Sequence, residues 1–136
     1  MSKAHTFPIR VYYEDTDAGG VVYHSNFIKF AERARTEALR QGGINQCDLL
    51  ENEKIAFAVR SCNVEFLKPA RLDDLLTIES RLDDIGNASL SISQTIRRQD
   101  EILVTLAVKL VVVNTGMKPT RIPDNVREVM ARIFNT

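Results

Sequence analysis

Residues 10–30, RVYYEDTDAGGVVYHSNFIKF, hold the side chains of this chain that are best suited to chemistry. A predicted strand ends there in three acidic residues, which precede two glycines and an apolar run into a predicted helix: Glu14, Asp15, Asp17, Gly19 and Gly20. The unpaired backbone N–H groups at a helix N-terminus carry partial positive charge and can bind the oxyanion that forms when a carbonyl is attacked. A carboxylate in a glycine-bearing loop that faces such amides is a workable catalytic arrangement.

The same loop also fits an interpretation without chemistry. Acidic residues in loops are commonly solvated or cap turns. A lone histidine such as His24 is more often a hydrogen-bonded structural residue than a catalyst. Composition alone therefore favours the structural interpretation.

The end of this segment belongs to a predicted amphipathic helix. Over residues 25–41 apolar side chains recur at helical spacing: Phe27, Phe30, Ala31, Ala34 and Ala38. Ser25 or Asn26 can cap the first turn, and Gly42-Gly43 can supply a left-handed exit. A short helical turn over 47–52 and a last helix over 124–133, after Pro123, complete the helical elements.

Strands make up most of the rest. Apolar patterns predict a first strand over 7–14 and four more over 55–67, 76–82, 89–96 and 102–113. The apolar face of the second changes phase near residues 60–62, which indicates a bulge or a strand covered on both sides. The last is apolar at nearly every position, as in a central strand with both faces covered. The short polar connections between the last three predict an antiparallel meander.

This order predicts an α+β fold in which the long helix covers one face of an antiparallel sheet. The 136 residues contain no repeat or linker, so 1–136 reads as a single domain. One long helix leaves much of the sheet's second face and its edges uncovered. We therefore expect a homo-oligomer, either a dimer that extends the sheet or a tetramer stacked on it.

Composition excludes several partners. Eighteen basic and eighteen acidic residues leave no net field for nucleic acid or an anionic membrane. The N-terminus lacks the apolar core of a signal peptide and no stretch is long enough to span a membrane, so we expect a cytoplasmic protein. Cys47 and Cys62 match no redox or zinc pattern and are interpreted as reduced packing groups.

Two blocks carry a resemblance to a known family. Residues 10–27, RVYYEDTDAGGVVYHSNF, resemble the active-site signature of the 4-hydroxybenzoyl-CoA thioesterase family of hotdog proteins. Residues 64–79, VEFLKPARLDDLLTIE, resemble its central strands. The whole chain is most similar to the YbgC-type branch, the acyl-CoA thioesterases associated with the Tol-Pal cluster. The signature is specific because it fixes residue types over many spaced positions.

The resemblance implies a hotdog fold, a sheet wrapped around one long helix, with active sites formed between subunits. It implies hydrolysis of acyl-CoA to the free acid and CoA, with Asp17 as nucleophile or general base. The oxyanion donors would be backbone amides near Val22, Tyr23 and His24. His24 could orient the acyl carbonyl or protonate the leaving thiolate, and Tyr23 could shape the pocket or donate its hydroxyl. Thiolate leaves readily, so neither a metal nor another cofactor is expected.

Two departures bear on the substrate. The aromatic-acyl enzymes of this family tend to carry Trp-Tyr where this chain has Tyr23-His24, and a basic pair where it has Ile85-Gly86-Asn87. Both differences favour short or medium aliphatic acyl groups. The CoA phosphates need local cations, for which Arg60, Lys68 and Arg71 are candidates, with Arg97-Arg98 as a further pair; ordinary surface charge is the alternative for each.

Two rival functions stay open. A hotdog dehydratase would pair a pocket histidine with an acid from the long helix, and Glu37 could be imagined in that role. A non-enzymatic hotdog subunit could bind acyl thioesters or an acyl carrier protein as a scaffold.

Overall fold

The computed structural model describes residues 4–134 of the chain. Within them, five strands form one antiparallel sheet in the order β1-β3-β4-β5-β2. The strands are β1 His5–Arg10, β2 Ile55–Phe66, β3 Leu75–Ile85, β4 Ser89–Arg98 and β5 Glu101–Asn114. β3, β4 and β5 form the predicted meander, and β1 and β2 are the two edges.

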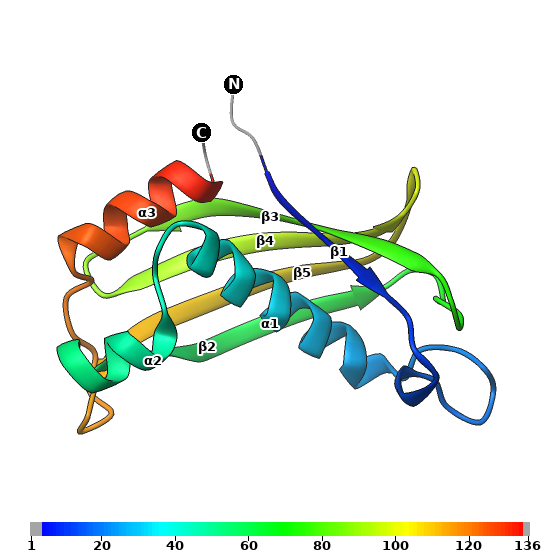
Figure 1. Ribbon diagram of the computed structural model, residues 1–136, viewed down its shortest axis with the longest axis horizontal. Coiled ribbons are helices and arrows are strands. Elements are labelled where there is room, and N and C mark those ends of the chain that lie inside the picture. Colours follow the sequence, from blue (N-terminus) through cyan, green and yellow to red (C-terminus); the bar gives the residue numbers. More distant parts are fainter. Residues whose placement is uncertain (1–3, 135–136) are drawn as a thin grey trace.

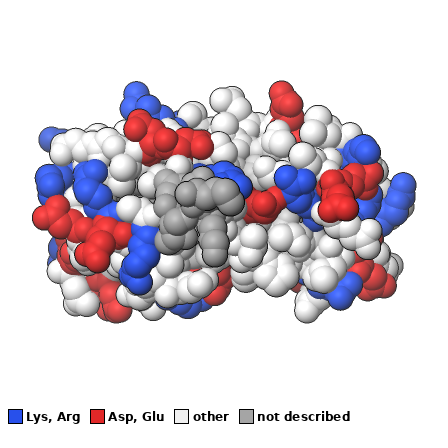
Figure 2. Space-filling model, turned by 90° about the horizontal axis from the view of Figure 1, so that it is seen from above, with Lys and Arg blue, Asp and Glu red and all other residues white. Residues whose placement is uncertain are grey.

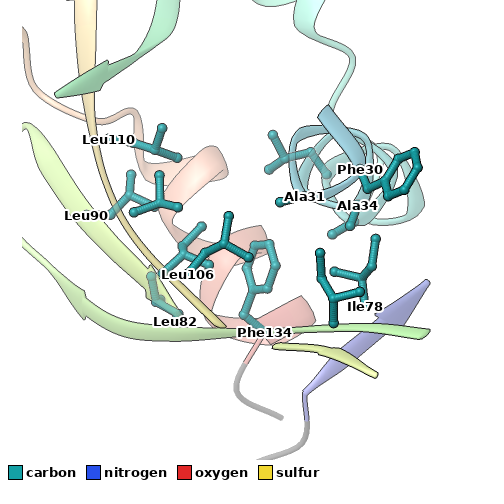
Figure 3. Packing of buried hydrophobic residues seen from close by; sticks show 14 of the residues in the cluster. Phe30, Ala31, Ala34, Ile78, Leu82, Leu90, Leu106, Leu110 and Phe134 are labelled. Atoms are coloured by element: carbon teal, nitrogen blue, oxygen red, sulfur yellow. The ribbon is translucent and has the colours of Figure 1, made fainter. Parts of the chain in front are cut away.

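The long helix α1, His24–Gln41, lies across one face of this curved sheet (Figure 1). Its contact face is built from three fully buried alanines, Ala31, Ala34 and Ala38, and from Phe27 and Phe30 near its start. Small side chains let the helix axis approach the strands closely, while the two phenylalanines fill the wider space at the N-terminal end. Figure 3 shows the Phe30, Ala31 and Ala34 side chains on one side of the core and the sheet's leucines opposite. The predicted α+β layout is confirmed.

Two further helical elements lie at the end of the sheet away from the start of α1 (Figure 1). α3, Asp124–Phe134, buries Met130 and Phe134 in the core. The predicted turn near residue 47 consists of α2, Gln46–Asp48, followed by a π-helical turn, Leu49–Glu53. α1 ends as predicted, since Gly43 has a positive φ of 91°.

Two local predictions were wrong. β1 ends at Arg10, and Tyr13–Asp15 forms a 3₁₀ turn instead of more strand. Neither Ser25 nor Asn26 caps α1, because the helix already begins at His24 and its N-cap residue, Tyr23, makes no side-chain capping bond. β5 is an inner strand between β4 and β2, as predicted; in the described chain its α1-facing side is buried and its other side is mostly half-buried.

Of the two alternatives for the phase change in β2, a bulge or a strand covered on both sides, the structure shows the bulge. The register with β5 shifts between Val59 and Ser61, so that Arg60 is the extra residue. A bulge there moves the apolar side chains of the second half of β2 back to the face that meets α1.

The surface offers no dominant charge. Figure 2 shows basic and acidic side chains interspersed over the face that it presents. None of the helices in residues 4–134 has the length and hydrophobicity needed to cross a membrane. Both cysteines are free and exposed, so the packing role expected for Cys47 and Cys62 was wrong.

Candidate active site

A tight loop holds Asp17 close to the start of α1. Thr16 and Val22 form an antiparallel bridge, and the Asp17 amide donates to the Val21 carbonyl at 2.9 Å. The Gly20 amide closes the turn by donating to the Asp17 carbonyl at 3.0 Å. Gly20 has a φ of +79°, a conformation that other residues adopt at a cost. The glycine pair therefore folds the chain back and sets Asp17 beside the strand that leads into the helix.

The Asp17 carboxylate is held on one oxygen only. Its Oδ1 accepts from the Gly19 amide at 2.8 Å, and among the described residues its Oδ2 has no partner. A Cβ on Gly19 would lie 3.2 Å from Oδ1, so a side chain there would press on the carboxylate. The Asp17 side chain is exposed in the single chain. One carboxylate oxygen is thus fixed and the other is open to a reactant.

The start of α1 offers fewer free amides than expected. The Val22 amide donates to the Ala70 carbonyl at 2.8 Å, and the Tyr23 amide donates to the Asp15 carbonyl at 3.0 Å. Neither can act as an oxyanion donor, which corrects that expectation for Val22 and Tyr23. The amides of His24 and Ser25, the first two residues of α1, donate to no group within residues 4–134. They are the unpaired donors that a helix N-terminus provides.

Aromatic side chains cluster at the start of α1. The rings of Tyr23 and His24 are tilted by 36° with centroids 4.4 Å apart, and His24 meets Phe66 edge-on at 6.1 Å. Phe66, the last residue of β2, also packs 6.0 Å from the ring of Phe27. It is 48% exposed, unusually open for a phenylalanine. The sequence analysis missed Phe66. The residue pattern of a strand does not indicate which helix residue will lie against the end of that strand.

The connection between β2 and β3, residues 67–74, packs against the Asp17 loop. Arg71 forms an isolated antiparallel bridge with Val21, and its amide donates to the Asp74 carboxylate at 2.8 Å. Arg98 donates to the same carboxylate oxygen at 2.8 Å and forms an ion pair with Glu101. Lys68 pairs with Glu101 at 2.8 Å. These ion pairs tie the connection to the β4–β5 turn.

Titration of this network follows from its contacts. Burial is the largest single influence on Asp74 and opposes its charge, but the Arg71 amide and Arg98 together hold the pKa of Asp74 below its usual value. The Arg98 pKa is raised by its hydrogen bonds to Asp74 and Glu101. Hydrogen bonds from Lys68 and Arg98 lower the Glu101 pKa. Asp74, Arg98 and Glu101 are therefore charged near neutral pH.

The predicted phosphate-binding cations differ in their distance from the Asp17 loop and in their ion pairs. Arg71 adjoins the Asp17 loop, and its side chain is in no ion pair of the described residues. Lys68 lies in the same β2–β3 connection as Arg71 but is already paired with Glu101. Arg60 is the bulge residue of β2, six residues before Phe66 and so roughly 20 Å from it along the strand. Of the further pair, Arg97 binds Glu79 and Arg98 binds Asp74.

The rest of the site residues can be placed as well. The Val22 side chain is buried, whereas Tyr23 and His24 are exposed at the mouth of the site. Glu37 lies thirteen residues beyond His24 on α1, about 20 Å along the helix axis, and pairs with Arg40. Within residues 4–134 no group of three or more His, Cys, Asp or Glu side chains could hold a metal ion.

Similar proteins bear on this arrangement. The family model described as Thioesterase superfamily matches residues 19–105. The chain is 41% identical over 128 residues to the acyl-CoA thioesterase YbgC of Haemophilus influenzae, covering 93% of this chain and 94% of that protein. It is 45% identical over 122 residues to the acyl-CoA thioester hydrolase YbgC of Escherichia coli O6:H1, covering 88% and 90%.

Solved structures agree with the fold. A probable thioesterase from Bartonella henselae superposes with a TM-score of 0.85 at 40% identity, covering 88% of this chain and 99% of that one. The predicted hotdog fold is confirmed by these similarities and by the sheet around α1. The chain belongs to the thioesterase superfamily of hotdog-fold proteins.

Proposed function

We propose that this protein hydrolyses acyl-CoA thioesters to the free acid and CoA, with Asp17 as the catalytic carboxylate. One observation carries the proposal. The Asp17 carboxylate, with one oxygen that has no partner, lies at one end of the short segment 18–23, and the unpaired amides of His24 and Ser25 lie at its other end. An ionised carboxylate can attack a thioester carbonyl or take a proton from a water held against it. The amides would bind the oxyanion that forms on the other side.

The neighbouring side chains fit supporting roles. His24 starts α1 with an exposed ring, from which it could orient the carbonyl or protonate the departing thiolate. Tyr23 packs against that ring in a tilted arrangement. Two nucleophilic schemes, attack by Asp17 and attack by water, use the same geometry.

The acyl group would lie along the apolar start of α1. Phe66 presents aromatic surface directly beside His24 and packs on the ring of the buried Phe27. Buried apolar surface of this kind suits a hydrocarbon chain, with about 0.8 kcal/mol gained for each methylene removed from water. We propose short to medium aliphatic acyl groups as substrates and a cytoplasmic site of action, where acyl-CoA is met.

Arg71 is the best placed of the three candidates for the CoA phosphates. It is exposed and lies next to the Asp17 loop, and its guanidinium is in no ion pair of the described residues, although its charge acts on the nearby Asp74 carboxylate. Arginine binds phosphate through several donors in a fixed plane. Lys68 is a weaker candidate because Glu101 already holds it, and Arg60 would reach a phosphate only if another subunit brought one to it.

A second copy of the chain fits the exposed edge of β2. This edge strand is twelve residues long and remains exposed or half-buried over most of its length, including Val59 and Phe66. A long open edge offers unpaired backbone groups to another strand. We propose a homodimer that continues the sheet through β2 and encloses the site at Phe66, with a tetramer as the next level of assembly.

Turnover with purified protein tests the proposal. Release of free thiol is followed with a thiol reagent over acyl-CoAs from acetyl to palmitoyl and benzoyl types. We expect hydrolysis that Asp17→Asn lowers at least a hundredfold, because the amide can neither attack nor accept the proton. Full activity in D17N would show that the site is elsewhere.

The same assay separates the rival functions. Absence of thiol release from every acyl-CoA, together with binding of an acyl carrier protein, would favour the scaffold. Dehydration without thiol release would favour the dehydratase, which the 20 Å separation of His24 and Glu37 makes the weaker alternative.

A further inference from the structure

A second carboxylate, that of Asp15, is buried beside the proposed catalytic loop. Asp15 is 6% exposed. Its Oδ2 accepts from the Tyr12 amide at 2.8 Å, and its Oδ1 accepts from the Asn26 side-chain amide at 3.0 Å. No ion pair of the described residues includes it. Both partners of this charge are therefore neutral donors.

A buried carboxylate without a cation is costly to keep. Its loss of hydration is offset only by hydrogen bonds to each oxygen, and a partner removed from such a group leaves the charge uncompensated. A neutral or apolar residue at position 15 would avoid that cost. The bond to Asn26 also engages a side chain that could otherwise cap the first turn of α1.

The contacts of Asp15 span the two halves of the site. Asp15 stands two residues before Asp17, in the 3₁₀ turn that leads into the catalytic loop. Its carbonyl accepts from the Tyr23 amide at 3.0 Å, and its side chain holds Asn26 in the first turn of α1. The Asn26 amide in turn donates to the Tyr23 carbonyl at 2.8 Å. Asp15 is thus hydrogen-bonded to the chain just before and just after the amides of His24 and Ser25.

We propose that Asp15 and Asn26 are positioning residues, which fix the Asp17 carboxylate against the His24 and Ser25 amides. The inference rests on the proposed function, since it assigns a role in that same site. Neither side chain contacts the reacting atoms in this scheme. Their effect is exerted through the backbone, where a misplacement of about 1 Å can lower turnover on the order of a hundredfold.

The pair allows a swap experiment. Asn26→Asp places a second carboxylate against Asp15, so the bond is replaced by repulsion. In the double variant Asp15→Asn/Asn26→Asp the donor and acceptor exchange places: Asn at 15 accepts from the Tyr12 amide and donates to Asp at 26. Net charge at the pair is then the same as in the wild type. Asp15→Asn alone can keep both bonds if the Asn26 amide turns over, so its effect should be small.

We expect N26D to lower kcat for acyl-CoA about tenfold to a hundredfold with KM changed less than twofold, and the double variant to recover most of the loss. Asn52→Asp is the matched control, the same chemical change at an exposed residue of the π-helical turn, with turnover unchanged. All rates are measured per folded protein, well below the melting temperature. A structural role alone would lower Tm and leave kcat intact.

Three results would overturn the inference: unchanged kcat in folded N26D, a double variant no better than N26D, or a loss confined to KM. If N26D does not fold, Asn26→Ala removes the donor without adding charge, and unchanged kcat in that variant has the same meaning. D17N runs beside them. Wild-type turnover that D17N abolishes and N26D leaves intact defeats only the positioning role, whereas D17N with full turnover defeats the proposed function with it.

Discussion

The Val22 amide donates to the Ala70 carbonyl at 2.8 Å, which docks the Asp17 loop on the connection between β2 and β3. The bridge between Val21 and Arg71 adds a second point of attachment. The geometry of the site therefore depends on a segment fifty residues further along the chain. That segment is itself held by the ion pairs of Arg98.

Asp74 should couple stability to this loop. Its carboxylate binds both the Arg71 amide and Arg98, so Asp74→Asn loses one charge-assisted bond and weakens the other. We expect the free energy of unfolding at pH 7 to fall by about 1–2 kcal/mol, with a lower kcat. Denaturant unfolding and acyl-CoA turnover measure the two. Asp73→Asn is the control, since its carboxylate is exposed and asparagine tolerates its φ of +70°.

The pH dependence of that difference has a definite sign. Because the pKa of Asp74 is lowered in the folded state, its contribution is fully present above the ordinary aspartate value and is lost as pH falls through the folded value. The gap in unfolding free energy between wild type and D74N should therefore close below about pH 4. A gap that stays constant between pH 7 and pH 3 would show that the lowered pKa does not stabilise the fold.

Much of the fold follows from local pattern, and the exceptions have physical causes. Period-two alternation located β3 and β4, and the phase change in β2 located the bulge at Arg60. The start of α1 was misplaced by one residue because Ser25 and Asn26 both resemble capping residues. Its side chain instead binds Asp15, eleven residues away, a contact that helical spacing does not encode.

The site was predictable only in part for a similar reason. The resemblance singled out Asp17, and the glycine pair indicated its turn. Which amides are free was not predictable, because the acceptors for Val22 and Tyr23 are carbonyls at residues 70 and 15. The same holds for Lys68, whose charge is neutralised across the sheet end by Glu101. Long-range partners decide which of several similar groups stays available.

Arg71 should contribute to binding of CoA and little to chemistry. Arg71→Ala removes an exposed guanidinium next to the loop, and we expect KM for acyl-CoA to rise about tenfold with kcat nearly unchanged. The same acyl group on pantetheine, which lacks the nucleotide phosphates, should show no such rise. Arg33→Ala, on the exposed side of α1, serves as the control for the loss of an exposed arginine. Equal effects on both substrates would remove Arg71 from the phosphate site.

Gly42 should be needed where α1 meets α3. A Cβ at this position would lie 2.3 Å from Cγ1 of Val129 and 3.0 Å from Cγ1 of Ile133. Gly42→Ala should therefore push α3 outward and lower the free energy of unfolding by about 1–3 kcal/mol. Gly86→Ala is the matched control, since its nearest atoms would lie at an ordinary 3.5 Å. Urea denaturation of the two variants compares them, and equal stability would contradict the packing argument.

Arg35, which is buried between α1 and the sheet, should need Gln94 as its hydrogen-bond acceptor. Arg35 on α1 is 9% exposed and donates to Gln94 Oε1 at 2.8 Å, while Gln94 Nε2 donates to Ser80 Oγ and to the Ala31 carbonyl. Burial lowers the pKa of Arg35, against the opposing charge of Glu32. Gln94→Met leaves the guanidinium without its acceptor, and we expect a loss of about 3 kcal/mol in unfolding free energy.

Removing both partners tests whether the loss comes from the unpaired charge. In Arg35→Met/Gln94→Met the buried cation is gone and apolar side chains of similar length fill the space, so part of the loss should be recovered; the remaining loss, about 1–2 kcal/mol, comes from the buried Ser80 hydroxyl, which no longer meets Gln94. Arg35→Met alone should fall between the two, because it leaves only the neutral Gln94 oxygen unpaired. Chemical denaturation of all four proteins gives the coupling energy. Strictly additive losses would mean that Arg35 and Gln94 contribute independently and that the core tolerates the lone cation.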